Sequence, residues 1–238
     1  MRGVLPARLV APAKLTLSLR VVGTRPDGLH LIDAEMVTLD LADTLTMTEG
    51  QGVVFAGPHG EGLVAGDDLV SRALDLVGRS AAVEVDKAIP AGAGLGGGSA
   101  DAAAVLRWAG FGDLVAAARL GADVAFCVVG GRARVTGIGE VVNPLPFERR
   151  TFTLLTPPVH CPTPAVYAAW DELGGPTGSH GNDLEPAALL VRPDLARWRD
   201  ELGSVSGAVP MLAGSGSTWF VEGAFPGEGR RVVVTTEG

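Results

Sequence analysis

The sequence predicts an α+β fold. Segments with the alternation of strands and segments with the spacing of helices follow one another without a regular order, and this mixture favours α+β over a repeated β-α-β unit. The chain has no internal repeat and no low-complexity tail, and 47% of its residues are hydrophobic, enough to bury a proper core. Its 238 residues suffice for one large or two modest domains.

The first strand is predicted over residues 8–22. Leucines at 15, 17 and 19 point to one face, while Lys14 and Thr16 lie on the opposite, polar face, so the strand is half buried. A lysine on such a face is by default a solvated surface residue, and the strand alone favours that interpretation of Lys14.

Turn residues, alternation and helical spacing predict the remaining elements of the first half. A turn-rich loop at 23–30 is followed by strands within 31–48, a hairpin region at 51–62, a helix over 67–77 capped by Asp67 or Asp68, and a strand over 82–86. Beyond a glycine-rich stretch come a helix over 99–109, a short helix over 111–120, an apolar run up to residue 129 and a hairpin over 130–142.

Two prolines within residues 143–146 mark the best candidate domain boundary, which divides the chain into 1–147 and 148–238. The second half is predicted to contain a strand over 151–156, helices over 164–173 and 195–202, a helical stretch that starts near 182, and a last strand over 231–235.

Five glycines within seven positions separate the strand at 82–86 from the helix that follows, namely Gly92, Gly94, Gly96, Gly97 and Gly98. Glycine lets backbone N–H groups converge, and a helix N-terminus adds unpaired donors, so this stretch favours phosphate binding over a structural turn or a linker. No lysine follows the glycines, which excludes a GxxxxGK[ST] loop. A dinucleotide fingerprint fits three of the glycines, but the acidic residue expected about twenty residues later is missing from a strand position.

Asp123 stands at the start of an apolar run, as Lys14 stands at the start of another. A lysine partner would offset the cost of burying the aspartate and could neutralise charge on a transferred phosphoryl group. An aspartate beside a phosphate site could deprotonate a hydroxyl nucleophile. A capping or turn residue is an equally good interpretation of Asp123.

The composition excludes several classes of function. A formal charge of −8 argues against a nucleic acid or an anionic membrane as the main partner. No apolar run is long enough to span a bilayer, and the N-terminus lacks the apolar stretch of a signal peptide, so we expect a cytoplasmic protein. Cys127 and Cys161 give neither a disulfide framework nor metal-ligand spacing, and buried thiols are expected.

The chain resembles the GHMP kinase superfamily in five blocks along its length, at 11–17, at 25–30, at 89–103, at 121–124 with 137–140, and at 182–185 with 212–217. The triple glycine and the segments 25–30 and 182–185 are typical, within that superfamily, of the kinases of 4-diphosphocytidyl-2-C-methyl-D-erythritol in the non-mevalonate isoprenoid pathway. The resemblance implies a two-domain fold with its active site in the cleft between the domains.

The resemblance also implies an ATP-dependent kinase that uses Mg²⁺ and has Lys14 and Asp123 as catalytic residues. Asp123 would act as the base toward the 2-hydroxyl of the substrate, and Lys14 would hold Asp123 and the developing charge. Ser99 would lie near the metal ion. The residues implied to bind ATP are Pro90, Gly92, Gly94, Leu95, Gly96, Gly97, Gly98 and Ser99.

The residues that the resemblance places at the substrate are Thr16, Leu29, His30, Asp123, Tyr167, Gly214 and Ser215. His30 would hydrogen-bond the cytosine, and the turn at 214–216 would shape the site from the second domain. For Tyr167, on the helix over 164–173, packing is the favoured interpretation and a role at the base pocket is the alternative. The expected partners are ATP and a small cytidine diphosphate substrate, with no nucleic acid and no membrane, and the expected state is a monomer or weak homodimer.

Three residues depart from the pattern of these kinases. Thr16 replaces an asparagine, Leu29 replaces an aromatic residue that stacks on the cytosine, and Ala100 replaces a serine. Two alternatives therefore stay open, a GHMP-type kinase for a different small alcohol and a nucleotide-binding homologue without turnover.

Overall fold

The structure is a computed structural model and describes residues 4–66 and 68–237. Its strands form a mixed sheet in the order β3-β4-β2-β10-β7-β9-β8, and β1 and the β5–β6 hairpin also join β2. The strands are β1 (Ala7–Thr24), β2 (His30–Thr48), β3 (Gly52–Ala56), β4 (Ala82–Asp86), β5 (Arg132–Gly137), β6 (Val141–Pro144), β7 (Thr151–Leu155), β8 (Met211–Leu212), β9 (Trp219–Glu222) and β10 (Arg230–Thr236).

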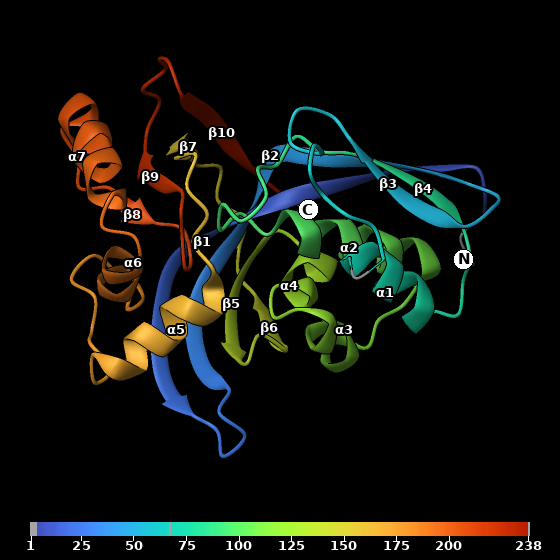
Figure 1. Cartoon of the computed structure of the whole chain (residues 1–238), viewed down its shortest axis with the longest axis horizontal. Coiled ribbons are helices and arrows are strands. Elements are labelled where there is room, and N and C mark those ends of the chain that lie inside the picture. The colour runs from blue at the N-terminus through green and yellow to red at the C-terminus, as the bar shows by residue number, and fades with distance from the viewer. Residues whose placement is uncertain (1–3, 67, 238) are drawn as a thin grey trace.

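Two groups of helices flank the sheet. In Figure 1, α1 to α4 lie together under β2, β3 and β4 at the right, while α6 and α7 lie at the left with β8 and β9. The helices are α1 (Leu69–Leu76), α2 (Gly97–Ala109), α3 (Leu114–Leu120), α4 (Val124–Val129), α5 (Thr163–Glu172), α6 (Glu185–Val191) and α7 (Leu195–Ser206). Strands and helices thus mix as the sequence predicts, and the α+β fold is confirmed.

The antiparallel pair of β1 and β2 is the longest in the sheet, with 18 and 19 residues. The leucines at 15, 17 and 19 face the core as their alternation predicts. Lys14 and Thr16, on the other face, are also buried, with exposed fractions of 4% and 2%. The default interpretation of Lys14 as a solvated surface lysine is therefore wrong, because the glycine stretch covers this face of β1.

Three buried clusters make up the core. The first packs α1 to α4 against β2 and β4, and the third packs α5 to α7 against β9. The second joins residues from both halves of the chain, such as Leu15 and Leu39 with Phe152 and Phe220. Strand β10 likewise pairs with both β2 and β7, so hydrogen bonds cross the predicted boundary at 147/148, which stays a prediction.

Most predicted elements are present with small shifts at their ends. Asp68 caps α1, accepting a hydrogen bond from the backbone N–H of Ser71 at 2.8 Å; the alternative cap, Asp67, lies outside the described residues. Both cysteines are free and buried, as expected. The apolar run after Asp123 is the helix α4. No helix within 4–66 and 68–237 combines the length and apolarity needed to cross a bilayer.

The hairpin expected at 51–62 is wrong. Strand β3 pairs in parallel with β4, from Gly52 opposite Ala82 to Ala56 opposite Asp86. A parallel pair needs a crossover connection, and α1 supplies it between the two strands. The glycines after β3 belong to the loop that leads to α1, so they mark a connection and not the tip of a hairpin.

Candidate active site

The glycine stretch forms a loop that ends in the first turn of α2. Helix α2 begins at Gly97, two residues earlier than predicted, and its N-cap is Gly96, which has a left-handed φ of 69° and no side chain to cap the helix. The backbone N–H groups of Gly97, Gly98 and Ser99 consequently have no acceptor within the helix. With the positive end of the helix dipole, they form a site suited to an anion such as phosphate.

The loop is held between two other parts of the chain. On one side, the backbone N–H of Lys14 donates to the carbonyl of Leu95 at 3.0 Å. On the other side, the N–H of Thr218 donates to the carbonyl of Ala93 at 3.1 Å. Gly94, with a φ of 78°, approaches the turn before Thr218 so closely that a Cβ atom would lie 2.9 Å from the carbonyl oxygen of Gly216. Glycine is therefore required at 94 by packing as well as by φ.

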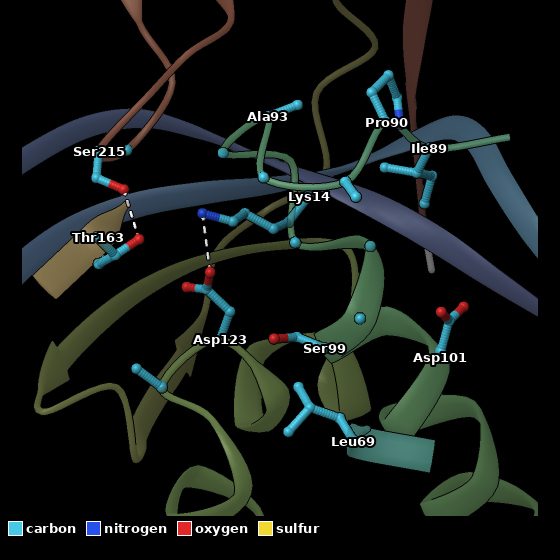
Figure 2. Close-up of a pocket in the computed structure, with 18 of the residues that line it drawn as sticks. Lys14, Leu69, Ile89, Pro90, Ala93, Ser99, Asp101, Asp123, Thr163 and Ser215 are labelled. Atoms are coloured by element: carbon cyan, nitrogen blue, oxygen red, sulfur yellow. Dashed lines mark hydrogen bonds and ion pairs between the residues drawn. The ribbon is translucent and has the colours of Figure 1, made fainter. Parts of the chain in front are cut away.

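Lys14 and Asp123 meet beside this loop. The Lys14 Nζ lies 3.0 Å from Oδ2 of Asp123 and donates to Thr16 Oγ1 at 3.1 Å. Asp123 is the N-cap residue of α4, yet its side chain makes no capping hydrogen bond and turns to Lys14 instead. Its side chain keeps 29% of its surface exposed, so a ligand in the cleft can reach the carboxylate. Figure 2 shows Lys14 and Asp123 pointing toward each other, with Ser99 beside them.

A second glycine-rich turn closes the site from the other half of the chain. Gly214 lies over Lys14, since a Cβ atom there would be 3.5 Å from Nζ. The buried amide of Asn182 donates to the carbonyls of Leu212 and Gly214 at 2.8 and 2.7 Å and so fixes this turn. The hydroxyl groups of Ser215 and Thr163 lie 2.8 Å apart and share a hydrogen bond, as Figure 2 shows.

These residues line a cleft of about 510 Å³. Both halves of the chain contribute to it. The predicted site residues that line it are Lys14, Thr16, Pro90, Gly92, Gly94, Gly96, Gly97, Gly98, Ser99, Asp123, Tyr167, Gly214 and Ser215. Three predicted residues do not line it: Leu95, whose side chain is buried in the core, and Leu29 and His30.

His30 lies next to the cleft, behind Tyr167. The two rings stack with centroids 4.7 Å apart, and Nε2 of His30 is 2.8 Å from Oδ1 of Asp171. Burial, and then the charge of Asp123, raises the pKa of the Tyr167 hydroxyl to about 12, so this ring stays neutral. Leu29 is 47% exposed.

The structure also places at the cleft residues that the predicted site does not include. Thr163 lines it from α5, the helix that carries Tyr167, and Asp171 on the same helix pairs with His30 outside this lining. Lys87 and Asp101 line the cleft under the loop. Both left a signal in the sequence, because Lys87 is one of just two lysines in the chain and Asp101 is a carboxylate in the first turn of the predicted helix.

Comparison with known proteins agrees with this geometry. Residues 68–131 match the N-terminal domain of GHMP kinases. The chain is 38% identical over 241 residues to the 4-diphosphocytidyl-2-C-methyl-D-erythritol kinase of Cereibacter sphaeroides, covering 88% of this chain and 87% of that protein. It is 37% identical over 238 residues to the same kinase of Paracoccus denitrificans, covering 90% and 85%.

The chain belongs to the 4-diphosphocytidyl-2-C-methyl-D-erythritol kinase family of the GHMP kinases. A crystal structure of 4-(cytidine 5'-diphospho)-2C-methyl-D-erythritol kinase superimposes with a TM-score of 0.75 at 29% identity, over 98% of this chain and 100% of that one. The resemblance drawn from five sequence blocks is thereby confirmed. In this GHMP kinase the loop before α2, the Lys14–Asp123 pair and the turn at 214–216 come together in one cleft.

Proposed function

We propose that this chain transfers the γ-phosphoryl group of ATP to the 2-hydroxyl of 4-diphosphocytidyl-2-C-methyl-D-erythritol, a step of the non-mevalonate isoprenoid precursor pathway. One observation carries the proposal. The Lys14–Asp123 pair, 3.0 Å apart, lies in a cleft, and one wall of this cleft is the N-terminus of α2 with its unpaired backbone donors. Phosphoryl transfer to a hydroxyl requires an anion-binding site beside a carboxylate that the substrate can reach, and the cleft has this arrangement.

In the proposed reaction, ATP places its phosphates on the N–H groups at the start of α2. The substrate hydroxyl lies against Asp123, which takes its proton while the oxygen bonds to the γ-phosphorus and the bond to the bridging oxygen of ADP breaks. Lys14 holds the Asp123 carboxylate and neutralises charge that develops on the transferred group.

Mg²⁺ fits the corner between Ser99 and Asp123. Both residues line the cleft, and Mg²⁺ binds oxygen ligands from one or two side chains together with phosphates and waters. We propose that Ser99 holds the ion, which would neutralise phosphate charge. The described residues contain no group of three or more histidine, cysteine, aspartate or glutamate side chains with metal-site geometry, so most ligands would come from the nucleotide and water.

For the cytidine, Tyr167 offers an aromatic face inside the cleft. His30 stacks on Tyr167 without lining the cleft, and the carboxylate of Asp171 can accept from its Nε2. This contact would hold the Tyr167 ring in place for the base, while the expected hydrogen bond from His30 to cytosine stays a prediction. Leu29 would contribute only apolar contact.

Replacing Tyr167 tests this assignment. We expect Tyr167→Leu to raise KM for the cytidylated substrate about tenfold, because one stacking contact with a base contributes about 1–3 kcal/mol. The KM for ATP should not change. Steady-state kinetics with each substrate varied in turn decides the matter, and an equal rise of both KM values would mean that Tyr167 only supports the fold.

A substrate panel tests the function itself. Coupled ADP release should require 4-diphosphocytidyl-2-C-methyl-D-erythritol, and the same alcohol without its cytidine should react at least 100-fold less efficiently. Turnover of a non-cytidylated alcohol alone would favour the alternative of another small-alcohol kinase, which the exposed Leu29 and the Thr16 substitution motivate. ATP binding without transfer to any acceptor would favour the homologue without turnover. Sedimentation would test the proposed monomer or weak homodimer.

A further inference from the structure

Asn182 and Asp183 are two polar residues, adjacent in the chain, that have no part in the reaction proposed above. Both are buried, with exposed fractions of 3% and 4%. They belong to the segment that connects α5 to α6. Burying an amide or a carboxylate costs free energy unless the group is hydrogen-bonded, so the partners of these two side chains indicate what the segment does.

Asp183 attaches this segment to β1. Its Oδ1 accepts from Nη1 of Arg20 at 2.6 Å, and its Oδ2 accepts from the backbone N–H of Val21 at 3.0 Å. The backbone adds two more hydrogen bonds. The N–H of Leu19 donates to the carbonyl of Gly181 at 2.8 Å, and the N–H of Asp183 donates to the carbonyl of Leu19 at 2.9 Å. The segment therefore has a fixed position relative to β1.

Asn182 connects the same segment to the turn at 214–216. Its Nδ2 group donates to the carbonyls of Leu212 and Gly214 at 2.8 and 2.7 Å, and its Oδ1 accepts from the N–H of Leu184 at 2.9 Å. Both amide protons and the amide oxygen are thus occupied. Within the described residues, no other donor reaches the carbonyl of Gly214. Asn182 therefore sets how far this turn lies from β1.

The turn bounds the space around the Lys14 ammonium. A Cβ atom at Gly214 would lie 3.5 Å from Lys14 Nζ and 3.9 Å from Thr16 Oγ1. The ammonium thus has Asp123 and Thr16 as its polar partners and Gly214 as its neighbour on a further side. Figure 2 shows Ser215, the next residue of the turn, on the side of the pocket toward which Lys14 extends. A movement of the turn would therefore reach Lys14 directly.

The turn contacts the phosphate loop through other groups. The carbonyl oxygens of Ala213 and Gly216 face Gly94 of the loop, where a Cβ atom would meet both of them. The amide of Asn182 instead binds the carbonyls of the two residues on either side of Ala213. The hydrogen bonds of Asn182 therefore act on the part of the turn that lies against Lys14, and the contacts with the phosphate loop do not depend on them.

We propose that Asn182 is a positioning residue for Lys14. Its amide occupies the carbonyl of Gly214 and holds the turn at the distance that leaves the Lys14 ammonium paired with Asp123. Without the amide, this carbonyl would be a buried acceptor that lacks a donor, and it would draw the neighbouring ammonium away from Asp123. Asn182 itself does not belong to the lining of the cleft. The proposal rests on the function proposed above and concerns how the Lys14–Asp123 pair is held.

Asn182→Ser removes the amide and keeps a small polar side chain. The serine hydroxyl offers one donor in place of two on a shorter side chain, so it cannot hold both carbonyls. We expect kcat to fall about tenfold, because a displaced Lys14 neutralises less of the developing charge. The KM for ATP should stay within about twofold, because the loop keeps its own contacts with the turn. Asn143→Ser, at the only other asparagine and exposed on β6, is the matched control with unchanged kcat. An unchanged kcat in Asn182→Ser would overturn the proposal.

A double-variant cycle with Lys14→Met shows whether Asn182 acts through Lys14. Lys14→Met alone should lower kcat about 100-fold, as expected when a group that stabilises charge in the transition state is removed. Adding Asn182→Ser to this variant should then change kcat less than about twofold, because effects of residues that act as a unit do not add. A further tenfold loss in the Lys14→Met background would show that Asn182 only supports the fold, and the proposal would be wrong.

The scarcity of lysine provides a measurement that does not need turnover. Protein labelled with ¹⁵N-lysine contains two side-chain ammonium groups, those of Lys14 and Lys87, and the signal lost in Lys14→Met assigns the NMR spectrum. We expect Asn182→Ser to shift the Lys14 signal and to leave that of Lys87, whose partners lie on β2 and α2. Asn143→Ser should shift neither. A Lys14 signal that stays in place in Asn182→Ser would contradict the positioning role, whereas absence of turnover in the unmodified protein would contradict only the proposed function.

The reverse measurement needs no substitution at position 182, so it does not depend on how well that variant folds. Protein labelled with ¹⁵N-asparagine contains two side-chain amide groups, those of Asn143 and Asn182, and Asn143→Ser assigns their signals. Coupling between two sites is reciprocal, so Lys14→Met should shift the side-chain signals of Asn182 and leave those of Asn143 in place. If neither pair of signals shifts in Lys14→Met, Asn182 and Lys14 are not coupled and the proposal fails.

Discussion

Asp123→Asn lowers kcat about 10³-fold or more and leaves the affinity for ATP unchanged or slightly higher. The amide has the shape of the carboxylate but cannot accept the proton of the substrate hydroxyl, and general-base catalysis contributes about 10²–10⁴-fold. Lys14 would keep its hydrogen bond to Thr16 and lose its carboxylate partner at 3.0 Å. Loss of one negative charge near the phosphates does not weaken nucleotide binding.

Coupled ADP release under saturating substrates measures this kcat, and calorimetry measures the affinity for ATP. Asp33→Asn is the matched control, because Asp33 pairs with Arg134 at the surface and lies outside the cleft. A kcat of Asp123→Asn within tenfold of the unmodified protein would exclude Asp123 as the base. Equal losses in both variants would point to a general effect of the substitution.

Gly94→Ala is expected to have the second largest effect, about a 100-fold loss in kcat/KM for ATP. Its Cβ atom would lie 2.9 Å from the carbonyl oxygen of Gly216 and closer still to that of Ala213, so the loop and the turn at 214–216 must separate. A displacement of about 1 Å in a phosphate-binding loop costs roughly 10²-fold in rate. The positive φ and the clash together should lower the free energy of unfolding by about 2–4 kcal/mol.

Gly78→Ala separates the two causes. Gly78 has a φ of 62°, in the same left-handed region as Gly94, but a Cβ atom there would meet nothing within 4 Å. This control should lose only about 1–2 kcal/mol of stability and keep its kcat/KM. Denaturant unfolding and steady-state kinetics on both variants measure the effects. Equal losses of activity would show that backbone strain, and not contact with the turn, explains the effect at position 94.

The loop and its flanking elements could be predicted because their signals are local. Five glycines between a strand and a helix occur within one short segment, and helix geometry alone leaves the N–H groups at the start of α2 free. The α+β class and most element positions follow from periodicity in the same way. The pairing partner of a strand does not follow from periodicity. For this reason a hairpin was expected where β3 in fact pairs in parallel with β4. Register between strands depends on contacts distant in sequence.

Asp123 shows the difference between what the sequence predicts and what the tertiary structure adds. From the sequence it is equally well a helix cap or a catalytic residue. In the structure its side chain makes no capping hydrogen bond and pairs with a lysine 109 positions earlier in the chain (123 − 14), an arrangement that supports the proposed catalytic role. Likewise, nothing near Asp171 in the sequence indicates His30, its hydrogen-bond partner on β2.

The sequence by itself determined that a glycine-rich loop precedes a helix in this chain and that the chain belongs with the GHMP kinases, since backbone conformation and the start of a helix depend on neighbouring residues. Only the tertiary structure decided what surrounds the loop. It buries Lys14 against Asp123, places Tyr167 in the cleft in front of His30, and sets Lys87 between Asp43 and Asp101 beneath the glycines. Charges interact through space, so groups far apart in the chain acquire their roles only when the sheet and helices bring them together.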